Sequence, residues 1–82
     1  NVNDTVYNER DIITKDGIIL RPDRVVVNVK NEAVIIDYKT GSQDKKHEQQ
    51  LQSYQDVLQD MRIIVKKKIL VYVNDDILVK EV

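Results

Sequence analysis

Two charges close an apolar segment near the middle of the chain. Asp37 and Lys39 directly follow Val34–Ile36, and the period of two in a β-strand places both side chains on one face. Placing a carboxylate and an ammonium at the end of a buried strand costs free energy unless the charges are paired or bind a ligand. Carboxylates can hold Mg²⁺ and a lysine can neutralise phosphate, so this spacing is compatible with phosphodiester hydrolysis.

A second carboxylate, Asp23, precedes this segment in the chain. A two-residue turn between the two strands would point Asp23 to the face opposite Asp37. A three-residue loop at Val29 to Asn31, with Asn31 in the left-handed conformation, instead sets the two carboxylates opposite each other, and a bulge at Pro22 would have the same effect. Facing residues lie roughly 4.5 to 5.5 Å apart, so one cation could bridge the pair. A metal site therefore requires the odd-length loop or the bulge.

The residue pattern predicts the elements that would position these side chains. Asp16-Gly17 is a hairpin signal, Pro22 should bend or bulge a long strand, and Ser42 or Asp44 can cap a helix that runs to about Arg62. Apolar and β-branched runs predict strands over residues 6–14, 18–29, 32–40, 69–73 and 77–82. The expected fold is α+β, or mixed α/β, in the order βββαββ with one helix packed on a central sheet.

The expected helix has one apolar face with polar residues beside it near its start. The apolar positions at helical spacing are Leu51, Tyr54, Leu58 and Met61, with Val57 at the edge. His47 and Gln50 lie on or beside that face, so polar groups point towards the sheet. A functional site explains such a placement better than packing does, although a non-catalytic, partly buried role is favoured for His47.

Composition limits the class of protein. The 82 residues suit a single domain, residues 1–82, that buries roughly 60% of its unfolded surface, and its core is expected to consist of Val, Ile and Leu. The net charge of −1 lacks the basic footprint of an autonomous nucleic-acid binder. Cations nevertheless cluster near the proposed site, at Arg21, Arg24, Lys39, Lys45 and Lys46, and Lys66–Lys68 form a run that we interpret as a solvated strand entry.

The same composition bears on location. No apolar run approaches the ~18 residues of a membrane span, and the polar N-terminal residues have no signal-peptide layout. The absence of cysteine fits a reducing interior. We therefore expect a cytoplasmic chain without membrane contact, and, because the pattern starts abruptly at Asn1, a segment of a longer polypeptide.

Three motifs in order resemble a known family. Arg21–Arg24, Ile36–Gly41 and Gln50–Tyr54 resemble the PD-(D/E)XK nuclease superfamily, most closely the RecB/AddA-type nuclease domain attached to helicases. The resemblance covers roughly Glu9 to Tyr54. It implies a restriction-endonuclease-like core and a metal-dependent DNA nuclease acting in DNA repair or recombination, with DNA and helicase domains as partners.

The resemblance also implies roles for individual residues. Asp23, Asp37 and Lys39 would be catalytic. The two carboxylates and the Tyr38 backbone carbonyl would bind Mg²⁺ or Mn²⁺, and Lys39 would orient or activate the attacking water and stabilise the phosphate. The supporting and DNA-contacting residues would be Gln50 and Tyr54, which match the family's Q-x-x-x-Y motif, and Glu9, which resembles an upstream acidic position.

Two departures from the family pattern leave other functions open. Residues before Glu9 cannot supply the family's preceding helix and metal-binding histidine, and the iron–sulfur branch is unsupported without cysteine. The alternatives are a catalytically incomplete nuclease-fold scaffold or DNA-binding module, and a small interaction domain in which Asp37 and Lys39 form only a surface ion pair. Exonuclease or endonuclease action, polarity and strand preference are not encoded in these motifs.

Overall fold

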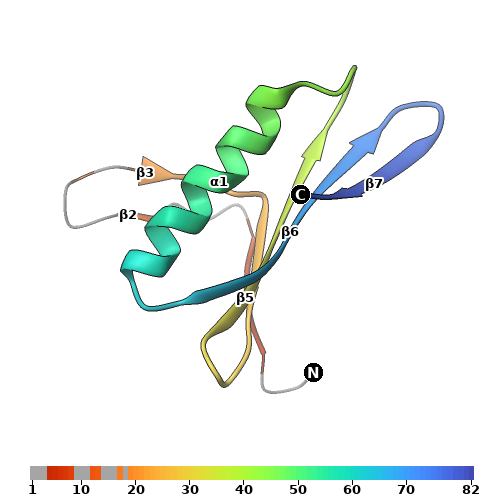
Figure 1. Cartoon of the computed structure of the whole chain (residues 1–82). Coiled ribbons are helices and arrows are strands. Elements are labelled where there is room, and N and C mark those ends of the chain that lie inside the picture. Colours follow the sequence, from red (N-terminus) through yellow and green to blue (C-terminus); the bar gives the residue numbers. More distant parts are fainter. Residues whose placement is uncertain (1–3, 9–11, 14–16, 18) are drawn as a thin grey trace.

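The computed structural model describes residues 4–8, 12–13, 17 and 19–82. Its elements are β1 (Thr5–Asn8), β2 (Ile12–Ile13), β3 (Ile19–Leu20), β4 (Arg24–Val27), β5 (Glu32–Lys39), α1 (Lys45–Asp60), β6 (Ile64–Val73) and β7 (Ile77–Glu81) (Figure 1). The main sheet has the order β1-β4-β5-β6-β7, and β2 pairs with β3 in a separate two-stranded sheet. With α1 lying along one side of the main sheet (Figure 1), the predicted mixed α+β fold is confirmed.

The two expected N-terminal strands are each divided. Both are antiparallel as predicted, because β1 pairs with β4 and β2 pairs with β3. The second strand breaks at Pro22, which is buried and has no N–H to donate to a ladder. The break lets β4 join the main sheet while β3 leaves it. The residues of the Asp-Gly hairpin turn lie largely outside the described part of the chain.

The β4–β5 hairpin has the three-residue loop on which the site depends. Arg24 pairs with Ile36 and Val27 with Ala33, and the N–H of Asn28 donates to the carbonyl of Glu32 at 2.9 Å. Asn31 has φ of 58°, a conformation that Asn tolerates better than most residues. The predicted three-residue loop is therefore confirmed. With this register, Asp23 and Asp37 lie on the same face of the sheet.

The Asn28 side chain stabilises the same loop. Its Oδ1 accepts hydrogen bonds from the N–H of Lys30 at 2.9 Å and the N–H of Glu32 at 3.0 Å. Its Nδ2 donates to Glu32 Oε1 at 2.9 Å. Asparagine side chains commonly satisfy turn N–H groups in this way, so contacts within the loop support the register of the hairpin. Strand β6 adds a contact from outside the hairpin, because the Ile64 N–H donates to the Asn31 carbonyl at 2.8 Å.

The helix is the crossover that makes β5 and β6 parallel neighbours. Asp44 caps its start, as predicted, by accepting from the N–H of Lys46 at 2.9 Å. It ends at Asp60, and Arg62 then adopts a left-handed φ of 64°. Leu51, Tyr54 and Leu58 are buried. The prediction that Met61 belongs to this apolar face is wrong, since its side chain is 50% exposed at the helix end.

The core lies between α1 and the sheet. It consists of Val25, Ala33, Ile35, Leu51, Tyr54, Leu58, Leu70 and Tyr72. Two tyrosines therefore share a core that was expected to be aliphatic. Each tyrosine can bury a large ring while its hydroxyl lies near polar groups.

Strand β6 is longer than expected and contains the lysine run. It starts at Ile64 rather than Ile69, and a register shift against Ala33 and Val34 leaves Lys66 as an extra residue. Strand β7 pairs only from Ile69 onwards. Lys66 and Lys67 are exposed on the part of β6 that β7 does not reach, which agrees with a solvated strand edge. Among the described residues, no helix has both the length and the apolar character needed to span a membrane.

Candidate active site

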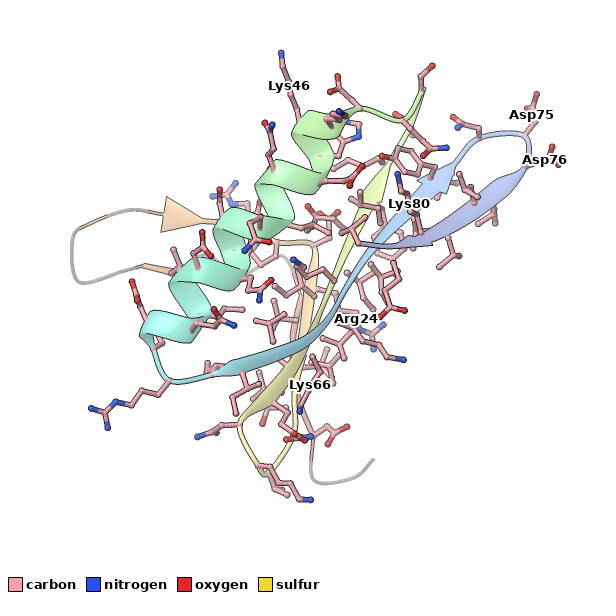
Figure 2. All side chains as sticks on the ribbon, viewed as in Figure 1. Arg24, Lys46, Lys66, Asp75, Asp76 and Lys80 are labelled. Atoms are coloured by element: carbon pink, nitrogen blue, oxygen red, sulfur yellow. The ribbon has the colours of Figure 1, made fainter. Side chains whose placement is uncertain are left out.

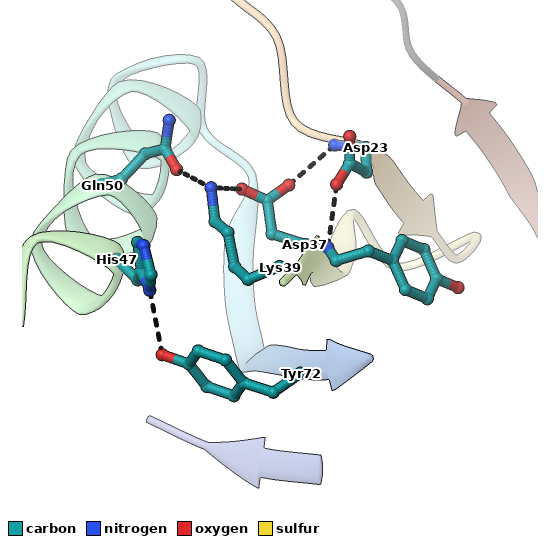
Figure 3. A network of polar contacts seen from close by, with 7 residues as sticks. Asp23, Asp37, Lys39, His47, Gln50 and Tyr72 are labelled. Carbon is teal, nitrogen blue, oxygen red and sulfur yellow. Dashed lines mark hydrogen bonds and ion pairs between the residues drawn. The ribbon is translucent and has the colours of Figure 1, made fainter. Parts of the chain in front are cut away.

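Two hydrogen bonds between backbone N–H groups and carboxylates link Asp23 to the segment Asp37-Tyr38. The N–H of Asp23 donates to Asp37 Oδ1 at 2.8 Å, and the N–H of Tyr38 donates to Asp23 Oδ2 at 2.8 Å (Figure 3). Each carboxylate is therefore fixed by the other strand's backbone. Asp23 Oδ1 and Asp37 Oδ2 are the oxygens not held by these backbone groups, so the pair keeps one oxygen on each residue for other contacts.

Asp37 is an acid held in a buried position. Only 3% of the surface of Asp37 is exposed to solvent. Burial raises the pKa of the Asp37 carboxyl and the charge of Asp23 raises it further, while the Asp23 N–H and the Lys39 ammonium lower it. A carboxylate in this position is stabilised by any additional positive charge.

Lys39 connects the carboxylates to the helix. Its Nζ lies 3.7 Å from Asp37 Oδ2 and donates to Gln50 Oε1 at 2.7 Å (Figure 3). The side chains of Asp37 and Lys39 share a face of β5, as predicted, and Gln50 reaches them from the second turn of α1. Three of the predicted site residues are thus joined in one chain of contacts.

Tyr54 borders the same carboxylates from the next helical turn. Its side chain is buried against the sheet, and burial raises the pKa of the Tyr54 hydroxyl, with smaller contributions in the same direction from the charges of Asp37 and Asp23. The hydroxyl therefore stays protonated and can donate a hydrogen bond at neutral pH. The structure brings together five of the six predicted site side chains, namely Asp23, Asp37, Lys39, Gln50 and Tyr54. The sixth, Glu9, lies outside the described residues.

The expected cluster of cations is only partly located at this site. Arg24 is the register partner of Ile36, so it lies on the face opposite Asp37, and Figure 2 shows it on the side of the sheet away from α1. Lys46 points away from the sheet at the start of the helix (Figure 2). Lys39, by contrast, lies beside the carboxylates, with its Nζ 3.7 Å from Asp37 Oδ2.

Several contacts beside the site were not anticipated from the sequence. The His47 Nδ1 lies 3.0 Å from the Tyr72 Oη, which gives this histidine a partner in the core rather than at the carboxylates. Asn74, which lies between the strands predicted over residues 69–73 and 77–82, binds the backbone of Gly41 twice: it accepts from the Gly41 N–H at 2.9 Å and donates to the Gly41 carbonyl at 3.0 Å. No local sequence pattern signals either contact, since 25 and 33 residues separate the partners.

The donor set suits a hard divalent cation that keeps most of its own waters. Among the described residues there is no group of three or more His, Cys, Asp or Glu side chains that could hold a metal ion. Mg²⁺, however, is commonly bound through one or two carboxylates, with water and phosphate oxygens completing its shell. Two converging carboxylates, one of them buried with a raised pKa, fit that requirement. The Tyr38 carbonyl as a further ligand stays a prediction.

Comparisons with known proteins agree with this arrangement. A family model described as "PD-(D/E)XK nuclease superfamily" matches residues 9–80. Among solved structures, one described as "Crystal structure of SSO0001" is similar at 28% sequence identity and a TM-score of 0.61. The match covers 93% of this chain and 41% of the SSO0001 chain, so this chain spans less than half the length of that protein. The search of curated proteins found no significant match.

Proposed function

Because the chain belongs to the PD-(D/E)XK nuclease superfamily, we propose that it hydrolyses DNA phosphodiester bonds with Asp23, Asp37 and Lys39 as its catalytic residues. The observation that carries this proposal is a reciprocal pair of hydrogen bonds: the Asp23 N–H donates to the Asp37 carboxylate, and the Tyr38 N–H donates to the Asp23 carboxylate. Those bonds hold two carboxylates together at a strand end, next to a lysine. Such pre-positioning is what charge stabilisation in a transition state requires.

Asp23 and Asp37 would hold Mg²⁺ or Mn²⁺. When bound there, the ion supplies Lewis-acid stabilisation of the phosphate and a lowered pKa for its water. Asp37 contributes a carboxylate whose position is fixed by the Asp23 N–H before any ion arrives. The burial of this carboxylate would strengthen its attraction for the cation, because a low-dielectric environment screens charge poorly.

Lys39 would orient the attacking water and neutralise the phosphate. The Lys39 ammonium donates a hydrogen bond to Gln50 Oε1 and lies at ion-pair distance from Asp37. These two contacts limit the directions in which the ammonium can point. The remaining donor capacity is available for a water or a phosphate oxygen. Gln50 therefore acts as a positioning residue, and the protonated Tyr54 hydroxyl would be a donor to the substrate or to water beside the carboxylates.

The proposal also covers the process in which the nuclease acts. Resemblance to RecB/AddA-type domains favours an exonuclease that works with helicase domains in DNA repair or recombination. The SSO0001 chain is more than twice as long as the part matched here, which is compatible with a nuclease unit embedded in a larger protein. Helicase domains would then deliver the DNA strand to the site.

A catalytically incomplete scaffold is the second candidate. It is favoured by the lack of a third carboxylate or histidine in the cluster among the described residues. A scaffold would bind DNA without cleaving it, and substitution of its carboxylates would leave that binding intact or strengthen it. The two candidates therefore differ in cleavage and in the effect of removing negative charge.

Cleavage assays on end-labelled DNA test the proposal. We expect the chain to degrade linear DNA in Mg²⁺ or Mn²⁺ but not in EDTA, and we expect Asp37→Asn or Lys39→Ala to lower the rate at least ~100-fold, since removing one transition-state contact of this kind has such effects. Asp75→Asn and Lys67→Ala are matched controls at exposed positions away from the site. Parallel assays on linear and closed circular DNA separate exonuclease from endonuclease action. Cleavage by both site variants at the parental rate would contradict the mechanism.

A further inference from the structure

A pocket opens beside the candidate active site, at the start of the β5–α1 connection. It is an open depression in the surface rather than an enclosed cavity, with a volume of about 550 Å³. Its lining comes from the segment after β5 and from the ends of β6 and β7, and consists of Gly41, Ser42, Gln43, Tyr72, Asn74 and Leu78. Gly41 ends the Ile36–Gly41 motif, and the other lining residues belong to none of the three family motifs.

The pocket is adjacent to Lys39. Tyr72, which belongs to its lining, is the register partner of Lys39 on the neighbouring parallel strand. Neighbouring strands lie about 4.8 Å apart, and Gly41 follows Lys39 by two residues. A phosphate held at Lys39 would therefore place its attached nucleoside within reach of this pocket.

Hydrogen bonds shape the pocket in the absence of a ligand. Asn74 holds Gly41 by two bonds, and Gly41 has a left-handed φ of 82° that favours glycine. Lys80 donates to Gln43 Oε1 at 3.2 Å and to Glu48 Oε2 at 3.1 Å. Because these contacts already order the rim, a ligand would lose less free energy in ordering it.

The lining chemistry identifies the ligand class. No lining side chain carries a charge, so the pocket does not match a phosphate or a metal ion. Leu78, which is 45% exposed, supplies apolar surface above the buried Tyr72, while Ser42 and Gln43 supply a hydroxyl and an amide. Apolar walls with a few donors and acceptors suit a flat heterocycle with polar edges, which is how single-stranded nucleic acids present their bases.

We propose that this pocket binds the nucleobase next to the phosphate held at Lys39. The inference rests on the proposed function, because it assumes that DNA occupies the carboxylate site. It adds a subsite that requires the base to be unstacked, so it favours single-stranded DNA or frayed ends over an intact duplex.

Equilibrium binding tests the subsite without requiring cleavage. The probe is a short fluorescein-labelled DNA single strand, measured by anisotropy in Ca²⁺, with either all bases present or one base replaced by an abasic site at successive positions. We expect one abasic position to weaken binding at least about fivefold, the lower end of the range found when one bound base loses its contacts. Gln43→Ala and Leu78→Ala should weaken binding of the intact strand by a similar factor and should have no further effect on the strand with that abasic position.

Matched controls separate the subsite from general effects. Gln59→Ala removes an exposed amide at the far end of α1, and Val79→Ala removes an apolar side chain from the other face of β7. Both should bind every strand like the parent. Equal affinity for intact and abasic strands, or pocket variants that lose the same factor on both, would overturn the subsite. A base-dependent affinity without any cleavage in Mg²⁺ or Mn²⁺ would instead support the subsite and refute the proposed nuclease.

Discussion

At the scale of single residues, Asp37 combines a proposed catalytic role with a cost to folding. Burial raises the pKa of its carboxyl, so the ionised form is less favourable in the folded chain than in the unfolded chain. Its Oδ1 accepts the Asp23 N–H, and an amide oxygen could accept the same bond. An asparagine at this position would keep that contact and remove the buried charge.

We therefore predict that Asp37→Asn increases the free energy of unfolding at neutral pH by about 0.5–2 kcal/mol, the size commonly found for single stabilising substitutions. The sign follows from the raised pKa: the penalty exists only where the carboxyl is ionised, so the gain should shrink as the pH falls towards its ordinary range near 4. Urea unfolding of both proteins across this pH range checks the result. A variant less stable than the parent at pH 7 would contradict it.

Metal binding gives a second prediction at the same residues. A ligand that binds only the folded state stabilises it by about 2.7 kcal/mol at 100 times its Kd. We expect millimolar Mg²⁺ or Mn²⁺ to raise the Tm of the parent and to leave that of Asp23→Asn and Asp37→Asn unchanged. Asp75→Asn, in the exposed β6–β7 turn, should respond like the parent. Equal shifts in all four proteins would show that the ions act elsewhere.

At the scale of elements, the β4–β5 loop sets the geometry of the site. The three-residue loop keeps Asp23 and Asp37 on one face, and a change of one residue in register would turn one of them away. The conformation of Asn31, with φ of 58°, is part of that loop. The position of Asp23 relative to Asp37 therefore depends in part on the backbone conformation of Asn31, which lies at the other end of the hairpin.

We predict that Asn31→Val lowers the free energy of unfolding by about 1–2 kcal/mol, because a side chain with a branched Cβ is strained in the left-handed region. Asn31→Gly should be neutral or nearly so, since glycine adopts that region readily. Thermal unfolding of the two variants and the parent provides the measurement. A destabilisation of equal size in both would mean that contacts of the Asn31 side chain matter more than its backbone conformation.

The elements also divide into those that sequence could predict and those that it could not. The loop register, the Asp44 cap and the apolar face at Leu51 to Leu58 follow from contacts within a few residues, so local patterns specify them. The early start of β6, the exposure of Met61 and the Asn74–Gly41 contact depend on partners that are far away in the chain. The Asp16-Gly17 signal indicates that β3 pairs with the strand before it. The placement of β3 and β4 in two different sheets was predicted only as a bend at Pro22, because no local pattern says that the two halves of a strand will join separate sheets.

At the scale of the whole molecule, the main sheet is covered unequally. Helix α1 packs on the side that carries Asp37 (Figure 1). The other side presents Val6, Tyr38, Val73, Ile77 and Val79 as exposed apolar side chains in the described part of the chain. Their register places them on one face, since Tyr38 pairs with Val71, which in turn pairs with Val79. Contiguous apolar surface of this kind promotes association.

The last prediction concerns this face. Ile77 and Val79 are 68% and 63% exposed, so replacing both with threonine keeps β-branched residues in the strand and removes little buried area. We expect the free energy of unfolding to change by less than about 1 kcal/mol in total, as at other surface sites, and concentration-dependent association to decrease. Light scattering over a concentration series measures the association. Leu78→Thr, on the helix side of the same strand, is the matched control and should associate like the parent. If the double variant associates as strongly as that control, the exposed sheet face does not govern the solution behaviour of the chain.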